Sequence, residues 1–387
     1  AGGLEAISQL LEAVPTNTGL AFIVAQHLSP GHKSMLPELI GRRTGMPVVE
    51  ISDGMHVEPN HVYIVPPDHN AGVLHGALHL FPLEKGEATH LRVDYLFESL
   101  AQDQGNRAIG VVLSGTGSDG TLGLKAIKAE GGVTFAQDED SAQYGAMPHS
   151  AIVAGWVDKV LPAAQIAQEL AQVARHPYVR RKQPEVSIPP EDSLNKIFFL
   201  LRHYTGHDFT HYKRSTINRR INRRMVLHKL ENLDEYVRYL QNNRGETEEL
   251  FEDLLINVTG FFRDPETFEA LKRSVFPRIL KGRATEDNIR IWVPGCSTGE
   301  EAYSIAIELL EYLGHEHIGY TIQIFGTDID QKAIQKARAG VYPETVVADL
   351  PSQRVQKYFL KVPAGYQVSK PVRDLCVFAE QDVLKDP

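Results

Sequence analysis

Apolar residues follow two alternating patterns in the first 175 residues. Short apolar runs, typical of buried strands, lie at 20–24, 62–65 and 108–113. Apolar residues at helical spacing open the chain, at Leu4, Ile7, Leu10, Leu11 and Val14. Strands that alternate with helices usually pair in parallel and are covered by helices on both faces. We therefore predict an α/β domain with a mostly parallel sheet over residues 1–175.

A proline-rich segment separates this domain from the rest of the chain. Residues 176–192 contain four prolines and no apolar periodicity, which predicts a semi-stiff linker. Helical patterns then run without a strand signal from 193 to 281, so we predict a small all-helical domain there.

Residues 282–387 return to strands and helices. An apolar run over 289–293 predicts a strand that leads through a glycine loop into a helix. A second strand is predicted at 321–325, followed by an amphipathic helix over 331–339. Candidate strands follow at 366–368 and 372–378. The chain should therefore end in a second α/β domain.

The composition narrows the class of protein. A hydrophobic fraction of 42% and a charged fraction of 23% are typical of globular proteins, and 387 residues need more than one core. Cys296 and Cys376 are the only cysteines, which excludes a disulfide framework and favours a reducing compartment. No apolar run reaches membrane-spanning length and no signal-like segment opens the chain, so we expect a cytoplasmic protein. The net charge of −9 argues against a general nucleic-acid binder.

The stretch 291–307 carries the clearest chemistry. Gly295 and Gly299 bracket a Cys-Ser-Thr loop between a strand and a helix. Glycine lets the backbone approach a ligand closely, and the free N–H groups that open the helix favour polar or anionic groups. Asp328 ends the next strand, where a carboxylate can accept both hydroxyls of a ribose. The pattern suits a nucleotide-like cofactor, but it lacks the glycine spacing of an NAD site and the lysine of a P-loop.

These segments resemble a known family. P-G-C-S-T-G-E-E-A-Y-S-I-A from Pro294, G-T-D-I-D from Gly326 and N-V-T-G-F-F-R from Asn257 resemble segments of the CheR family of chemoreceptor glutamate methyltransferases. The resemblance implies a Rossmann-like domain that uses S-adenosylmethionine and releases S-adenosylhomocysteine, with no metal. It also implies that the strands at 366–368 and 372–378 belong to a small antiparallel subdomain. The cofactor-binding residues it implies are Asn257, Thr259, Arg263, Glu301 (or, second, Glu300), Asp328, Asp382 and Val383.

Two of these residues need comment. A glutamate carboxylate is already a nucleophile at neutral pH, so methyl transfer requires placement rather than a strong base. We expect Arg263 to hold the substrate carboxylate, because a guanidinium fork binds carboxylates in a fixed geometry. Asp382 stands where the family usually has asparagine. An aspartate carboxylate can accept a hydrogen bond from the adenine amino group, but it cannot donate one.

The predicted helical domain contains a basic run. Residues 211–230 include seven lysines and arginines and no acid. Arg219 and Arg223, like Arg220 and Arg224, are four residues apart and project from adjoining rows of one helix. Such a face favours an acidic partner; a plain solvated face is the alternative, and nucleic acid is less favoured because aromatic residues are not interleaved. The CheR resemblance implies that this helix docks onto glutamate-rich methylation helices of chemoreceptor-like proteins.

Two polar residues end strands of the first domain. His27 follows the strand at 20–24 and Asp119 follows the strand at 108–113, at the sheet edge where open α/β sheets place their chemistry. A histidine oriented by an aspartate activates a hydroxyl nucleophile in acyl transfer. Ser114 and Ser118 are internal candidates for that hydroxyl, although both share the loop of Asp119.

The first domain also resembles a family. A-Q-H-L-S-P-G-H from Ala25, V-Y-I-V-P-P-D from Val62 and L-S-G-T-G-S-D-G from Leu113 resemble the CheB family of chemoreceptor glutamate methylesterases. The resemblance implies that His27 is the general base and Asp119 orients it. It places the nucleophilic serine immediately before Ala1, so we expect this chain to be a fragment without esterase activity.

Together the two resemblances predict a bifunctional protein of sensory adaptation, which methylates receptor glutamates and hydrolyses the resulting methyl esters. Its expected partners are chemoreceptor-like proteins, with flanking sensor or regulatory domains in the full protein and no membrane insertion. Two alternatives stay open. One is a non-catalytic sensory scaffold, and the other is a methyltransferase that acts on a small molecule.

Overall fold

The computed structural model describes residues 3–26, 35–82, 92–180, 191–210, 212–255, 259–281, 288–314, 320–347 and 350–383. His27 and Asn257 of the predicted sites lie outside these ranges. The chain divides into two compact units, Ala1–Leu254 and Leu255–Pro387.

Short strands form three sheets in the described part of the first unit. One parallel sheet has the order β1-β4-β2, from Phe22–Val24, Val62–Ile64 and Val48–Glu50. A second parallel sheet has the order β7-β8-β9, from Ile109–Val112, Val133–Gln137 and Lys159–Leu161. The third is antiparallel in the order β3-β6-β5, from Met55–His56, Ala77–Pro82 and His69–Leu74. The strands predicted at 20–24, 62–65 and 108–113 are confirmed as β1, β4 and β7.

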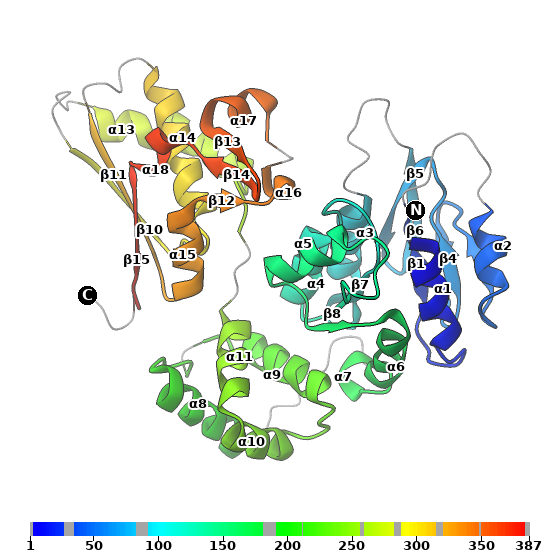
Figure 1. Ribbon diagram of the computed structural model, residues 1–387. Coiled ribbons are helices and arrows are strands. Elements are labelled where there is room, and N and C mark those ends of the chain that lie inside the picture. The colour runs from blue at the N-terminus through cyan, green and yellow to red at the C-terminus, as the bar shows by residue number, and fades with distance from the viewer. Residues whose placement is uncertain are drawn as a thin grey trace. The chain divides into compact units, whose positions relative to one another are not determined.

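Helices cover both faces of the parallel strands (Figure 1). Val62 and Ile64 of β4 enter one core with Leu10 of α1, whereas Tyr63 between them enters a second core with Leu96 of α3. Successive strand residues point to opposite faces, so this alternation confirms a sheet buried on both sides. The helices of this part are α1 (Gly3–Ala13), α2 (Leu36–Gly41), α3 (Arg92–Gln104), α4 (Thr121–Ala129), α5 (Ala146–Ala154) and α6 (Ala163–Val173), with a 3₁₀ turn at Gly105–Arg107.

The described residues between 191 and 254 are mainly helical, as predicted. Within the predicted linker, Pro177–Arg180 forms α7, and its Tyr178 and Val179 are buried. Val226 and Leu227 of α9 share a core with Ile166 of α6, so the helical part packs against the sheet-containing part. The helices are α8 (Glu191–Thr205), α9 (Arg214–His228), α10 (Leu233–Asn242) and α11 (Arg244–Leu254).

The second unit contains a parallel sheet with the order β10-β11-β15, from Asn288–Pro294, Thr321–Asp328 and Cys376–Glu380. An antiparallel sheet has the order β12-β14-β13, from Val341–Tyr342, Gly365–Val368 and Phe359–Val362. The strands predicted at 289–293, 321–325 and 366–368 are confirmed.

The prediction for 372–378 is wrong in two ways. Its first residues belong to the short helix α18 (Lys370–Arg373), where Pro371 suits the first turn because that turn needs no N–H donor from it. Its last residues form β15, which pairs in parallel with β11 and is not part of the antiparallel sheet. A short buried helix and a strand of either sheet both require apolar residues, so the apolar pattern could not distinguish between them.

Helix α14 (Glu300–Leu313) packs against the parallel sheet of the second unit. Its Ala306 and Ile307 share a core with Ile289 of β10 and Ile324 of β11. Figure 1 shows α14 and α15 alongside these strands. The remaining helices are α12 (Pro265–Ala270), a π-helical turn (Leu271–Val275), α13 (Phe276–Leu280), α15 (Gln331–Ala339), α16 (Glu344–Val347) and α17 (Ser352–Tyr358).

Candidate active sites

The turn from β10 into α14 has left-handed backbone at three positions. The angle φ is +67° at Gly295, +49° at Ser297 and +95° at Gly299. Glycine accepts such angles without strain, whereas serine adopts them rarely. Gly299 is the N-cap residue of α14, so the turn delivers the chain directly from the sheet into the helix.

Asp328 holds this turn from the neighbouring strand. Its Oδ2 accepts the N–H of Ser297 at 2.7 Å, and its Oδ1 accepts the N–H of Asp330 at 2.9 Å. Cys296 adds a backbone link by donating its N–H to the carbonyl of Thr327 at 3.0 Å. Each carboxylate oxygen has a further lone pair, so Asp328 can hold the turn and still accept two ribose hydroxyls.

The turn has one open side and one closely packed side. A Cβ atom at Gly295 would meet no atom within 4 Å, which leaves space for a ligand. A Cβ atom at Gly299 would lie 2.8 Å from Cβ of Ala337, and one at Gly326 would lie 2.6 Å from the ring of Phe378. Gly299 therefore lets α15 approach the turn closely, and Gly326 lets the ring of Phe378 in β15 pack against β11. The residues present fit a nucleotide-like cofactor such as S-adenosylmethionine.

Two acids open α14, and they differ in exposure. Glu300 is 3% exposed, and its Oε2 accepts the hydroxyl of Thr298 at 2.6 Å. Glu301 is exposed. Both lie in the first helical turn, next to the glycine turn, so the predicted preference for Glu301 stays a prediction. Burial raises the pKa of Cys296 to about 12, so its thiol is a packed apolar group and not a nucleophile.

The segment that contains Arg263 forms a strained turn ahead of α12. The angle φ is +50° at Phe262 and +59° at Asp264, so two non-glycine residues with left-handed backbone flank Arg263. Phe262 donates its N–H to Oγ of Ser304 in α14 at 2.9 Å, which ties the turn to the helix that begins at the glycine turn. Arg263 is exposed and Thr259 is half-buried.

Asp382 and Val383 follow β15. Gln381 donates its N–H to the carbonyl of Asp328 at 2.9 Å, so the segment after β15 runs beside the end of β11. Asp382 is half-buried and Val383 is 54% exposed. These two predicted residues and Asp328 therefore lie at the same sheet edge.

In the first unit, Asp119 follows β7 and is 4% exposed. Its Oδ1 accepts the N–H groups of Val93 and Asp94 at 3.1 and 2.9 Å, and its Oδ2 accepts the N–H of Val93 at 3.0 Å. These donors lie in the first turn of α3, where unpaired N–H groups and the helix dipole favour an anion. Its pairing with His27, which lies outside the described residues, stays a prediction.

Asp94 is a candidate that the sequence did not reveal. Its side chain is buried, and its Oδ1 accepts the N–H of Gly123 at 2.6 Å. Burial raises the pKa of Asp94 to about 7; the N–H of Gly123 opposes this rise, and the charge of Asp119 adds to it. A single aspartate on a helix gives no pattern that separates it from a surface acid, so only the packing identifies it.

The arginines of α9 do not form the predicted docking face. Arg223, Arg220 and Arg224 are 0%, 2% and 7% exposed. The side chain of Arg219 is 34% exposed and pairs with Glu130 at 3.1 Å. The prediction of an exposed face for acidic receptor helices is therefore wrong for three of these four arginines.

The partners of Arg223 explain why this charged side chain can be buried. Arg223 pairs with Asp158, which precedes β9, and with Asp253 of α11, and it donates to the carbonyl of Gly132 at 2.9 Å. Burial alone would raise the pKa of Asp158, but the charges of Arg223 and Lys128, together with the hydrogen bonds to the carboxylate, lower the pKa to about 2. Arg220 donates to carbonyls at the end of α4 at 2.6 and 2.8 Å. Arg219 and Arg223 are thus paired with acids of their own unit, and Arg220 is held by backbone carbonyls.

Arg224 connects α9 to the other helices. It pairs with Glu246 of α11, which also accepts hydrogen bonds from the ring of His228 at 2.6 Å and the hydroxyl of Tyr236 at 2.7 Å. Burial would raise the pKa of Glu246, but the hydrogen bonds from Arg224 and His228 lower it to about 2. Asp158 and Glu246, two of the carboxyl groups that hold α9 in place, are therefore ionised at neutral pH.

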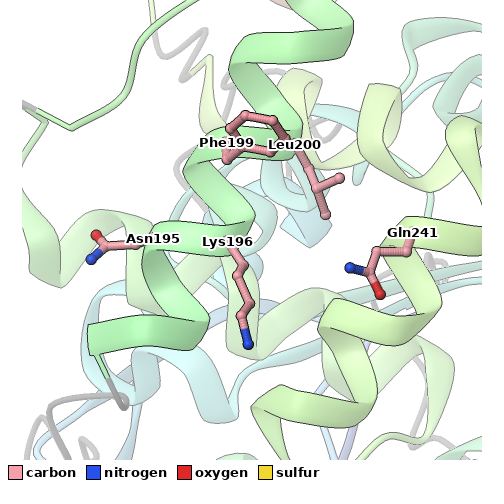
Figure 2. Close-up of a pocket in the computed structure, with 5 residues that line it drawn as sticks. All are labelled: Asn195, Lys196, Phe199, Leu200 and Gln241. Atoms are coloured by element: carbon pink, nitrogen blue, oxygen red, sulfur yellow. The ribbon is translucent and has the colours of Figure 1, made fainter.

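A surface pocket lies between α8 and α10 (Figure 2). Its volume is about 400 Å³, and its lining residues are Asn195, Lys196, Phe199, Leu200 and Gln241. None of the predicted site residues is among these five. Across the described ranges, no helix is both long and apolar enough to cross a membrane.

Comparison with known families divides the chain into three segments. Residues 1–170 match the family model described as CheB methylesterase. Residues 192–255 match the CheR methyltransferase all-alpha domain, and residues 257–387 match the CheR methyltransferase SAM binding domain.

Individual proteins show the same division. The chain is 33% identical over 374 residues to an uncharacterised 104.1 kDa protein in the hypE 3′ region of Rhodobacter capsulatus, covering 91% of this chain and 39% of that protein. It is 28% identical over 201 residues to a chemotaxis protein methyltransferase of Borreliella burgdorferi, covering 51% of this chain and 71% of that protein. It is 37% identical over 175 residues to protein-glutamate methylesterase/protein-glutamine glutaminase 3 of Paramagnetospirillum magneticum, covering 44% of this chain and 49% of that protein.

The chain thus spans 39% of the Rhodobacter protein and about half of the methylesterase. The two resemblances drawn from sequence motifs are confirmed by independent segments of the chain. Residues 1–170 thus belong to the CheB methylesterase family, and residues 192–255 and 257–387 belong to the CheR methyltransferase family.

Proposed function

We propose that the protein methylates glutamate side chains of chemoreceptor-like proteins and hydrolyses the resulting methyl esters. The observation that carries the methyltransferase half is the hydrogen bond from Ser297 N–H to Asp328, which joins the glycine turn to a carboxylate at the end of β11. That arrangement, next to the open space at Gly295, matches the requirements of an adenosine-containing cofactor.

Residues of the second unit divide the binding task. Bound S-adenosylmethionine supplies an electrophilic methyl group. We assign Asp328 to accept hydrogen bonds from the ribose hydroxyls, and Asp382, beside Val383, to accept one from the adenine amino group. Glu301, or else Glu300, is assigned to the amino group of the methionine part. Additional hydrogen bonds are assigned to Asn257 and Thr259.

Arg263 positions the substrate. The attacking glutamate carboxylate needs no deprotonation at neutral pH, so its alignment with the methyl group decides the rate. Arg263 lies in a turn tied to α14 through Phe262 and Ser304, and α14 begins at the cofactor turn. A guanidinium carried by this turn can hold one carboxylate oxygen while the other attacks. Most of the α9 arginines are buried whereas Arg263 is exposed, so we assign Arg263 the contact with the acidic substrate.

The esterase half rests on Asp119. Its carboxylate is held by three hydrogen bonds from the first turn of α3, so its position is set before a substrate binds. We assign Asp119 the role of orienting His27, which acts as the general base toward a serine nucleophile. Attack of that serine on the ester carbonyl would expel methanol as the acyl-enzyme forms, and water would then hydrolyse the acyl-enzyme to free the glutamate carboxylate and the serine.

The methyltransferase assignment can be tested with the intact protein. Calorimetry with S-adenosylhomocysteine should show that Asp328→Ala loses about 1–3 kcal/mol of binding free energy, since hydrogen bonds to an ionised acceptor are lost. Asp374→Ala is a matched control, because Asp374 is an exposed acid of the same unit. Transfer of labelled methyl groups should be seen to a glutamate-rich receptor helix. Transfer only to small carboxylic acids would favour the small-molecule alternative, and binding without any transfer would favour the scaffold.

The esterase assignment has its own readout. Release of methanol from a methylated receptor peptide by the full-length protein should fall by several orders of magnitude in His27→Ala and in Asp119→Asn. Asp140→Asn, at an exposed acid of the same unit, should release methanol at the unmutated rate. Full activity of Asp119→Asn would remove Asp119 from the site.

A further inference from the structure

A second arginine, Arg354, packs against the turn that carries Arg263. The guanidinium of Arg354, in α17, lies 4.1 Å from the ring centroid of Phe262, the residue immediately before Arg263. An arginine stacked on an aromatic face is attracted by the ring and restricts its rotation. Phe262 is also the residue whose N–H donates to Ser304, so its ring and its backbone are both fixed.

Acids of α14 hold Arg354 in that position. Arg354 Nε donates to Oε1 of Glu311 at 3.1 Å, and one terminal nitrogen donates to Oε2 of Glu311 at 2.6 Å and to Oε2 of Glu308 at 2.9 Å. Glu308 is 1% exposed and also pairs with Lys272. The bidentate pair orients the guanidinium plane, which a lysine ammonium would not do.

The backbone at the turn needs such a hold. Phe262 and Asp264 have φ of +50° and +59°, and a bulky residue such as phenylalanine adopts this backbone only when its surroundings enforce it. The neighbouring Phe261 packs edge-to-face on Tyr342 at 4.9 Å, and Tyr342 donates its hydroxyl to the carbonyl of Thr298 in the cofactor turn at 2.7 Å. Adjacent phenylalanines thus tie the Arg263 turn to the cofactor turn and to α14.

We infer that Arg354 is a positioning residue for methyl transfer. It acts through Phe262 to keep Arg263 aligned with the methyl group, and it touches neither cofactor nor substrate itself. This inference rests on the proposed role of Arg263 in holding the substrate carboxylate. It adds a residue that lies 91 positions further along the chain, outside the segments that carry the cofactor turn and the Arg263 turn.

The test compares three variants of the intact protein. Arg354→Met keeps the length of the side chain but removes the charge and the fork, whereas Arg354→Lys keeps only the charge. Lys357→Met is the control, because Lys357 is an exposed cation on the same helix. Arg354→Met should lower kcat for methyl transfer on the order of tenfold to a hundredfold. Its affinity for S-adenosylhomocysteine should stay within about threefold, and Arg354→Lys should recover only part of kcat.

A double variant tests whether the effect passes through Arg263. In an Arg263→Ala background, Arg354→Met should cause no further loss of kcat, because the group that it aligns is gone. Additive losses would overturn the inference, as would a loss of cofactor affinity that matches the loss of kcat. The latter result would show that Arg354 only maintains the fold.

Hydrogen exchange provides a readout without turnover. The amide of Phe262 should exchange faster in Arg354→Met than in the unmutated protein, whereas amides of the cofactor turn should not change. Unchanged exchange at Phe262 overturns the inference about Arg354 whatever the activity. Absence of methyl transfer by the unmutated protein would instead overturn the proposed function.

Discussion

A buried carboxyl group at position 94 lies beside the acid assigned to orient His27. Both are less than 5% exposed, and the N–H of Asp94 is one of the donors to the carboxylate of Asp119. Burial disfavours the charged form of Asp94 and, with the charge of Asp119, raises its pKa to about 7. Near neutral pH the folded protein therefore carries a carboxyl group that is partly protonated at this site.

This raised pKa predicts a dependence of stability on pH. The folded state binds the proton of Asp94 more tightly than the unfolded chain, so its contribution is complete below about pH 4 and is lost as the pH rises to about 7. Asp94→Asn keeps an acceptor for the N–H of Gly123 but cannot titrate. Urea unfolding of the first unit should thus show that the variant gains stability relative to the unmutated protein over this range, on the order of a few kcal/mol. Asp140→Asn is the control, and a variant curve parallel to the unmutated one would refute the shift.

The local sequence pattern was sufficient to locate some candidate site residues but not others. The positions of Gly295, Gly299 and Asp328 in the fold could be predicted. The strand, turn and helix signals that place them lie within a few residues of them in the sequence. Asp94 could not, since its significance comes from Gly123 and Asp119 in other elements.

At the scale of elements, α9 shows the same limit more sharply. Its arginines have the spacing of an exposed basic face, yet Arg223 is fully buried between Asp158 and Asp253. Asp158 lies 65 residues from Arg223 in the sequence, so a charge run read by itself does not reveal its neutralising partner. Helical periodicity identifies which residues share a face, but it does not identify what that face meets.

Removal of the buried cation should therefore destabilise the protein. Arg223→Ala leaves Asp158 and Asp253 without their main partner, and loss of one member of a buried pair costs about 3–5 kcal/mol. Lys213→Ala removes an exposed cation at the start of the same helix and should change the unfolding free energy by less than about 0.5 kcal/mol. Equal effects of the two substitutions in a urea titration would contradict the buried arrangement.

The carboxyl groups around α9 predict the behaviour in acid. The pKa values of Asp158 and Glu246 are both lowered to about 2 in the folded state, from 3.8 and 4.5. Their stabilisation is present above about pH 4.5 and is lost as the pH falls toward 2. Near-ultraviolet circular dichroism should record loss of packing of the first unit across this range, and Asp158→Asn should make the loss less steep.

At the scale of the whole molecule, the chain combines two families but divides at Leu254. The CheR-type helical segment lies in the same compact unit as the CheB-type sheets, through the buried arginines and through Val226 and Leu227 of α9. Family motifs predicted which domains are present. They did not predict this grouping, because it depends on contacts between segments that belong to different families.

The two units should respond separately to the cofactor product. The chain has two tryptophans, Trp156 in the first unit and Trp292 in the second, where its indole N–H donates to Thr327 next to Asp328. In Trp156→Phe, the fluorescence of Trp292 should report a higher melting temperature of the second unit when S-adenosylhomocysteine is bound. At a concentration a hundredfold above Kd, the ligand stabilises the unit by about 2.7 kcal/mol. In Trp292→Phe, the transition reported by Trp156 should not move. A joint shift would show that both units unfold as one.

The salt bridges of Arg223 also limit how such proteins can be recombined. An esterase domain grafted from a relative in place of residues 1–170 would have to supply a carboxylate at the position of Asp158 and accessible carbonyls at the end of the α4 equivalent. A methylesterase that lacks such an arginine helix does not need these groups on its surface. Grafts should therefore be chosen by the residue at position 158 before overall identity, and a hydrophobic replacement of Arg220 and Arg223 should widen the range of domains that the helices accept.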